Sequence, residues 1–123
     1  MITSYTITIP IPPRAIGPNG RCHRMKKHRL CQAYKQTVGY IALGVLAGNK
    51  PKWVKATYTV EWFAKRKTLL DEDNADGSLK YARDALQAVE MIADDKGLSR
   101  TGFVFAVDRT NPRVVLTITE ASE

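Results

Sequence analysis

Five polar side chains in the second half of the chain have the types and spacing expected of a hydrolytic metal site. Asp71 and Asp73 are two residues apart, and an extended backbone would direct both carboxylates to the same side. Asp94 and Asp95 follow just past the next predicted helix. Carboxylate oxygens favour Mg²⁺, with Mn²⁺ as a substitute, and such an ion generates a hydroxide nucleophile for phosphodiester hydrolysis. Lys80, early in that helix, carries the charge needed to stabilise a developing phosphorane.

Electrostatic repulsion indicates what a cluster of these carboxylates would require. Two carboxylates about 5 Å apart repel by about 3 kcal/mol at an effective dielectric constant of about 20. Three such pairs would cost about 10 kcal/mol, which is comparable with the whole stability of a small domain. A cluster must therefore take up protons or bind a divalent cation. The alternative interpretation is structural, because Asp is common in turns and at helix starts. An EF-hand is excluded because position 12 of its loop would hold Ala82 or Arg83 instead of Glu.

The charge of the chain is divided unevenly along its length. The formal net charge is +7, yet no Asp or Glu precedes Glu61. The first 60 residues contain ten Lys or Arg, whereas the last 63 contain nine Lys or Arg and all twelve acids. An acid-free basic half is typical of a protein that binds a polyanion, so we expect phosphate contacts from this half and from the basic segment after the second strand. The candidate DNA-binding residues are Arg14, Arg21, His23, Arg24, Lys26, Lys27, Arg29, Lys65, Arg66 and Lys67.

Length and composition exclude several classes of protein. A chain of 123 residues with 44% apolar residues is suited to one globular domain and not to a disordered tract. No apolar run approaches the roughly 18 residues of a membrane span, and the first residues lack the features of a signal peptide. We therefore expect a cytoplasmic protein with free thiols, no membrane partner and no small-molecule cofactor. A zinc site is a weaker alternative, because the adjacent Cys22 and His23 are poorly spaced as ligands beside His28 and Cys31.

Hydrophobic periodicity predicts the helices and strands that must position these residues. Alternation predicts strands over residues 3–10 and 53–63, and shorter strands over 103–107 and 114–118. An apolar stripe predicts a helix from Leu30 to Leu46, after a long basic loop over 14–28. An acidic loop over 71–77 precedes a second helix of about 14 residues with Ser78 as its N-cap. The order β-α-β-α-β-β predicts a single α+β domain over residues 1–123, with a mixed sheet and two helices packed on it.

Several segments match one family pattern. Residues 5–13 read as an opening strand and a Pro-Pro turn, residues 32–35 (QAYK) lie in the first helix, and residues 116–120 (LTITE) form the ending. The most specific part is Asp71-Glu72-Asp73-Asn74, then Lys80, then DAL at 84–86, then Asp94-Asp95. In these segments, and along nearly the whole chain, the sequence resembles the RusA family of Holliday junction resolvases, the small nucleases of phages and prophages.

The resemblance implies a fold, an activity and a set of site residues. It implies that Asp71, Asp73 and Asp95 are the essential metal-binding acids, that Asp94 is accessory, and that Lys80 acts near the scissile phosphate. It also implies a Mg²⁺-dependent homodimer that nicks two strands of a four-way DNA junction symmetrically during recombination and repair. A two-fold dimer suits such a two-fold substrate.

Two departures from the family pattern keep other interpretations open. Five residues separate Asn74 from Lys80, more than in the best-known member, and Leu69-Leu70 stand where arginines are expected. The runner-up is therefore a junction-binding protein of the same fold without efficient catalysis. A cationic protein that binds membranes or RNA is a third class, although no cationic amphipathic helix or RNA-binding motif supports it.

Overall fold

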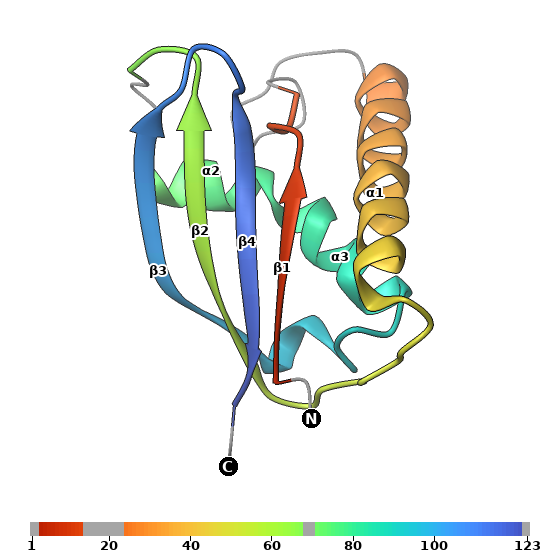
Figure 1. Ribbon diagram of the computed structural model, residues 1–123. Helices are drawn as coiled ribbons and strands as arrows, with labels where there is room; N and C mark the ends of the chain where they lie inside the picture. Colours follow the sequence, from red (N-terminus) through yellow and green to blue (C-terminus); the bar gives the residue numbers. More distant parts are fainter. Residues whose placement is uncertain (1–2, 14–23, 68–70, 122–123) are drawn as a thin grey trace.

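The computed structural model describes residues 3–13, 24–67 and 71–121 of the chain (Figure 1). Four strands form one mixed sheet in the order β1-β4-β2-β3, in which β2 and β3 are parallel and the other neighbouring pairs are antiparallel. The elements, in chain order, are β1 (Ser4–Ile9), α1 (Arg24–Leu46), β2 (Ala56–Ala64), α2 (Glu72–Ser78), α3 (Lys80–Ala88), the 3₁₀ helix η2 (Asp95–Gly97), β3 (Leu98–Val107) and β4 (Arg113–Glu120). The predicted α+β class and mixed sheet are confirmed.

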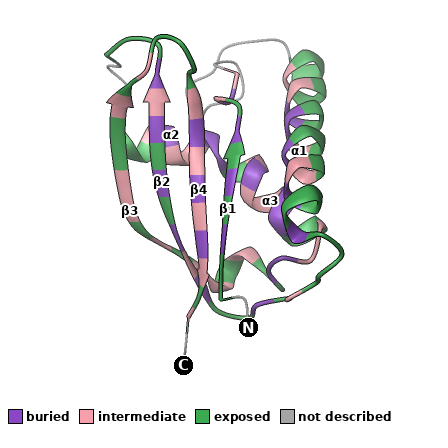
Figure 2. Ribbon diagram, in the orientation of Figure 1, coloured by how far each residue is buried: buried purple, intermediate pink, exposed green. Residues whose placement is uncertain are grey.

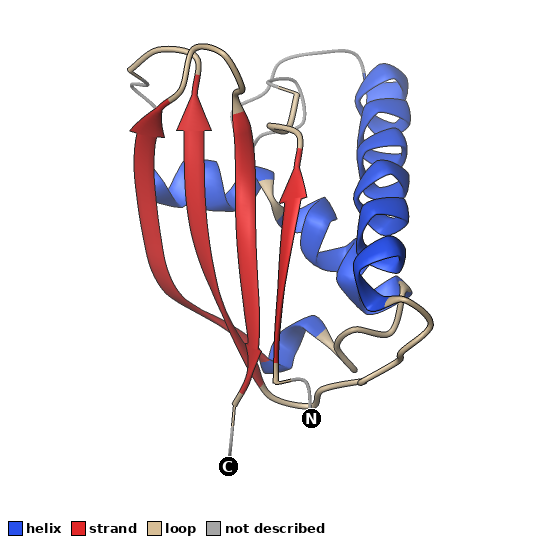
Figure 3. Cartoon of the chain, viewed as in Figure 1, coloured by secondary structure: helices blue, strands red, loops and turns tan. Residues whose placement is uncertain are grey.

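The core lies between one face of the sheet and the helices. Helices α2 and α3 cross that face, and α1 packs against α3 and β1 (Figures 1 and 3). Alternate residues of β1, β2 and β4 are buried there (Figure 2), as their alternating sequences predict. The opposite face is open and rich in Thr; Thr6 and Thr117, for example, face each other across β1 and β4 with hydroxyl oxygens 3.4 Å apart. No helix in the described part of the chain is long and apolar enough to cross a membrane.

Helix α1 starts earlier than its apolar stripe indicates. The stripe is correct, because Cys31, Tyr34, Val38 and Ala42 are buried, and the Tyr34 hydroxyl donates a 2.7 Å hydrogen bond to the Pro10 carbonyl. The structure, however, places residues 24–28 in the helix, so the prediction of a loop through residue 28 is wrong over these positions. Arg, Lys and Met have high helix propensity, and exposed turns at the start of a helix can form without buried apolar residues. The rest of that predicted loop, residues 14–23, lies outside the described residues.

The predicted acidic loop over residues 71–77 is also wrong, because most of it forms helix α2. Asp71 is the N-cap of this helix, and Ser78 is not a cap: its hydroxyl donates to the Ala75 carbonyl at 2.6 Å. The predicted helix of about 14 residues after Ser78 is shorter in the structure, where α3 ends at Ala88 and contains nine residues. Asp73 is therefore helical, and the expectation that an extended backbone directs Asp71 and Asp73 to the same side does not apply.

Strand β3 is longer than the predicted five residues and forms the edge of the sheet. It begins directly after Gly97, where a Cβ atom would collide with the Val54 carbonyl oxygen, so this close backbone approach requires glycine. Phe103 and Phe105 pair with Val60 and Trp62 of β2, and the two phenylalanine rings lie 4.9 Å apart. Because no strand covers its outer edge among the described residues, β3 is much less buried than β2.

Candidate active site and nucleic-acid interface

Asp71, the first candidate metal ligand, is engaged in capping helix α2. Its Oδ1 accepts a 2.7 Å hydrogen bond from the Asn74 backbone N–H, and its Oδ2 accepts a 3.1 Å bond from the Asn74 side chain. This interaction satisfies one of the free N–H groups at the helix start and places a negative charge at the positive end of the helix dipole. The D-x-D-N motif therefore has a local structural role as well as any catalytic one.

Arg100 of β3 faces the first two turns of α2 and pairs with three of its carboxylates. Its guanidinium nitrogens lie 3.1 Å from Glu72, 3.5 Å from Asp73 and 3.6 Å from Asp76. Asp73 is 94% exposed on its side chain, whereas Arg100 and Asp76 are largely covered. Asp73 is therefore the carboxylate of this group that can reach a substrate or an ion with the least rearrangement. We call Asp71, Glu72, Asp73 and Asp76 the α2 carboxylates.

Below the surface, Asp76 joins a network that anchors α2 to the sheet. The Tyr58 hydroxyl donates to Asp76 Oδ1 at 2.8 Å, and Arg83 Nη1 lies 3.3 Å from the same oxygen and 3.0 Å from the Asp76 carbonyl. Burial of the hydroxyl, and secondly its hydrogen bond to Asp76, raise the pKa of Tyr58 to about 12. Asp76 is thus held by two guanidinium groups and one protonated tyrosine.

Asp94 and Asp95 stand at the 3₁₀ helix η2, just before β3. Asp94 is the N-cap of η2 and accepts a 3.1 Å hydrogen bond from the Lys96 backbone N–H. This bond, followed by a side-chain hydrogen bond shared with the neighbouring Asp95, lowers the pKa of Asp94 below its usual value. The Asp95 backbone N–H in turn donates to the Gln87 side-chain oxygen at 3.3 Å. We call Asp94 and Asp95 the η2 pair.

The structure does not bring the predicted metal ligands together in one group. Within residues 3–13, 24–67 and 71–121, no three side chains of Asp, Glu, His or Cys stand close enough to hold a metal ion. The oxygen donors fit a hard divalent cation in type, but both Asp71 oxygens bind Asn74, and Asp73 pairs with Arg100. Lys80 is exposed with its ammonium 6.0 Å from the Tyr81 ring, and no ion pair connects it to a candidate acid among these residues.

The candidate cations gather at one end of the sheet, which we call the basic end. Strands β1, β2 and β3 run in the same direction, so the segments that follow them meet at one edge, beside the first turns of α1 (Figure 1). In the described part of the chain, the exposed cations at this end form no ion pair. They are Arg24, Lys26, Arg29, Lys65, Arg66, Lys67 and Arg109. Lys27 shares the first turns of α1, whereas Arg14, Arg21 and His23 lie outside the described residues.

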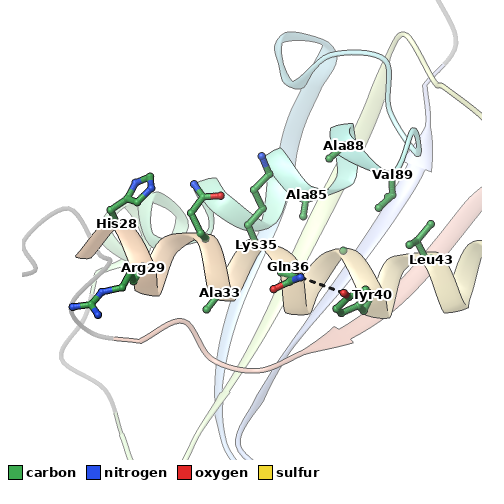
Figure 4. A pocket seen from close by; sticks show the side chains of 12 residues that line it. His28, Arg29, Ala33, Lys35, Gln36, Tyr40, Leu43, Ala85, Ala88 and Val89 are labelled. Atoms are coloured by element: carbon green, nitrogen blue, oxygen red, sulfur yellow. Dashed lines mark hydrogen bonds between the residues drawn. The ribbon is translucent and has the colours of Figure 1, made fainter. Parts of the chain in front are cut away.

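An open groove between α1 and α3 extends from the basic end. His28, Arg29 and Lys35 line one part of it, and Tyr40 and Leu43 line the other, while Ala85, Ala88 and Val89 contribute from α3 (Figure 4). Tyr40 is 67% exposed and accepts a 3.2 Å hydrogen bond from Gln36. None of the described residues that line the groove is acidic, so among these residues the groove continues the positive surface without a carboxylate to repel phosphate.

Two functional candidates were missed from the sequence. Arg100 stands before the predicted strand 103–107, and extending that strand to Leu98 would have placed it beside β2. Arg109 lies in the predicted turn between the last two strands, and the parallel course of β2 and β3 puts it at the same end as Lys65. Both depend on pairing between distant strands, which periodicity does not reveal.

A scan against protein-family models finds no family that matches this chain. A search of curated proteins likewise finds no match.

Proposed function

We propose that this protein is a Mg²⁺-dependent, structure-selective endonuclease that acts as a homodimer and resolves four-way DNA junctions by paired nicks. The observation that carries the proposal is the basic end, an acid-poor surface whose exposed cations form no ion pair with another described residue. Cations that are not neutralised within a protein are available to displace the counterions of a nucleic acid. The motif resemblance to the RusA family then selects junction DNA and hydrolysis from among the possible polyanionic ligands and reactions.

Phosphate binding is the first role that the proposal assigns. Lys65, Arg66 and Lys67 extend from β2, and Arg24, Lys26 and Arg29 extend from the opposite side of the same end. Cations on two sides of one surface can contact two separate phosphate backbones, as a branched substrate requires. The same role is proposed for Lys27, and for Arg14, Arg21 and His23.

The carboxylates are the second part of the proposal. Asp71, Asp73, Asp94 and Asp95 would hold Mg²⁺, which supplies a hydroxide nucleophile and charge neutralisation when bound. Because these acids stand in two groups in the described chain, a common site requires them to approach one another. Asp73 must also exchange its Arg100 contact for the ion. Lys80 is exposed at the start of α3 and is free to turn toward a bound phosphate.

A junction-cleavage assay tests directly whether the protein is an endonuclease. Wild-type protein in Mg²⁺ should nick a synthetic four-way junction in two opposing strands, and Asp73→Asn should reduce the rate at least about a hundredfold. Glu120→Gln is the matched control, because it removes an exposed carboxylate that belongs to neither group. If the wild-type protein bound junctions but cut none in either Mg²⁺ or Mn²⁺, the proposal that it is an endonuclease would be wrong.

The second candidate function is junction binding without efficient cleavage. The separation of the two carboxylate groups and the use of both Asp71 oxygens in capping favour it. Titration with Mn²⁺ distinguishes the two functions. A nuclease should bind the ion in a manner that Asp73→Asn and Asp95→Asn each weaken, whereas a binding protein should show no site that depends on both residues.

A further inference from the structure

The outer edge of β3 presents an unpaired row of backbone hydrogen-bonding groups. Strand β3 contains ten residues and pairs on one side with β2, and no second strand pairs with it among the described residues. An exposed edge strand of this length can pair with another chain unless charge, proline or a covering element prevents it. Residues 102–107, GFVFAV, contain neither charge nor proline, so the edge lacks these protections.

The side chains of the same strand are exposed and apolar. Val104 is 58% exposed, Val107 is 53% exposed and Phe105 is 37% exposed. Phe105 packs on Trp62 with ring centroids 6.2 Å apart, so its position is fixed from within the chain, although much of its surface remains in water. A row of exposed apolar side chains on an unpaired strand is a feature of association surfaces, and it is an aggregation hazard on a monomer.

From these features we infer that β3 pairs with β3 of a second copy of this chain, antiparallel and centred on Val104, to form one sheet across a two-fold axis. In this register Phe103 lies opposite Phe105 of the second copy, so that aromatic residues pair on both sides of the axis. The inference rests on the proposed function only for its relevance to a two-fold junction; the interface itself follows from the edge strand.

Charge selects the antiparallel arrangement and the second copy as occupant. Parallel pairing would place the two basic ends side by side, where their exposed cations repel one another. Antiparallel pairing turns one copy end for end, so that each η2 pair, Asp94 and Asp95, is directed toward the basic end of the other copy. The chain is therefore electrostatically complementary to its own inverted copy along this edge.

Substitution of Val104 tests the interface in the absence of DNA and metal. Sedimentation of the wild-type protein at micromolar concentration should show a dimer. Val104→Lys places two ammonium groups opposite each other at the axis, and it should raise the dimer dissociation constant at least about a hundredfold. Val54→Lys is the matched control, because Val54 is 67% exposed and lies outside β3; it should leave the dimer intact. A monomeric wild-type protein, or a Val104→Lys variant that remains dimeric, would overturn the inference.

A crosslink tests the register without disrupting the fold. Val104→Cys, made in a chain with Cys22→Ser and Cys31→Ala, should form a disulfide-linked dimer on mild oxidation, because residues at the axis of an antiparallel pair have Cα atoms about 4.5–5.5 Å apart. Val54→Cys in the same background should not crosslink. Absence of the Val104→Cys crosslink in a protein that sediments as a dimer would overturn the β3 register. Neither measurement depends on junction cleavage. The β3 interface could therefore be confirmed even if the protein were not a nuclease.

Discussion

The Tyr58 hydroxyl lies 2.8 Å from Asp76 Oδ1 and connects the centre of the sheet to helix α2. Arg83 Nη1 lies 3.4 Å from the same hydroxyl, so sheet, α2 and α3 meet at one polar contact. This contact holds the helix that carries Asp71 and Asp73 against the sheet. The position of the candidate site therefore depends on a tyrosine and an aspartate outside the recognised motif.

Tyr58→Phe should lower the free energy of unfolding by about 1 kcal/mol, because it removes the hydrogen bond to the largely covered Asp76 carboxylate and the longer bond that the hydroxyl accepts from Arg83. Tyr40→Phe, which removes an exposed hydroxyl bonded only to Gln36 in the described chain, should change it by less than about 0.5 kcal/mol. Chemical denaturation of both variants provides the comparison. Equal effects of the two substitutions would show that the Tyr58 contact contributes no stability.

The raised pKa of Tyr58 also gives a pH dependence of known sign. In the unfolded chain the Tyr58 hydroxyl has its ordinary pKa of 10.0, whereas in the folded protein its pKa is about 12. Between these values the unfolded state has released its proton and the folded state has not, so stability is present below pH 10 and is lost as the pH rises toward 12. Tyr58→Phe should remove this part of the alkaline loss, which denaturation curves at pH 9 to 12 would detect.

Asp71 can be tested separately as a cap and as a charge. Asn caps a helix about as well as Asp, so Asp71→Asn should change stability by less than about 0.5 kcal/mol, whereas Asp71→Ala should cost about 1 kcal/mol. Under the proposed function, both variants should lose junction cleavage to a similar degree, because both remove the carboxylate. Full cleavage by Asp71→Asn would show that the residue serves only to cap α2.

The sequence predicted the strands and the stripe of α1 well because their side chains alternate between core and solvent with fixed periods. Tyr5, Ile7 and Ile9 are buried as expected, and so are Tyr58, Val60 and Trp62. Helix α2 could not be predicted in this way, since Asp, Asn and Gly have low helix propensity and the segment contains few apolar residues. Its stability comes from the Asp71 cap, from burial of Ala75 and from Arg100, which is distant in the sequence.

The same contrast between local sequence patterns and tertiary arrangement applies to the site residues. The basic residues at 24–29 and 65–67 were recognised because they form local runs, and the structure places both runs at one end. The expected union of Asp71, Asp73, Asp94 and Asp95 depended on where a helix of assumed length would end. The early end of α3 at Ala88 and the η2 turn alter this geometry, and neither has a periodic signal.

Arg100→Met should destabilise the protein by about 1 to 2 kcal/mol, because Glu72, Asp73 and Asp76 lose a shared, largely covered counter-charge while the apolar stem of the side chain is kept. Arg109→Met is the matched control, since Arg109 is exposed and forms no ion pair in the described part of the chain; its effect should stay below about 0.5 kcal/mol. Addition of 0.5 M NaCl should reduce the difference between the two variants only partly, because a covered ion pair is screened less than an exposed one. A difference that vanished in salt would identify the Arg100 contacts as surface pairs of little structural consequence.

Neutralisation of the basic end should weaken DNA binding and reduce its dependence on salt. Replacement of Lys65, Arg66 and Lys67 by Gln removes up to three phosphate contacts, and each contact contributes about 0.9 to the slope of log affinity against log salt concentration. Replacement of Lys50, Lys52 and Lys55 by Gln removes the same formal charge at the opposite end of the sheet, so it controls for the change in net charge. Junction binding measured from 50 to 300 mM salt should show a shallower slope for the first variant, whereas the second should keep a slope close to that of the wild type. Equal slopes for the two variants would mean that the protein attracts DNA through its overall charge, and the basic end would then have no special role in binding.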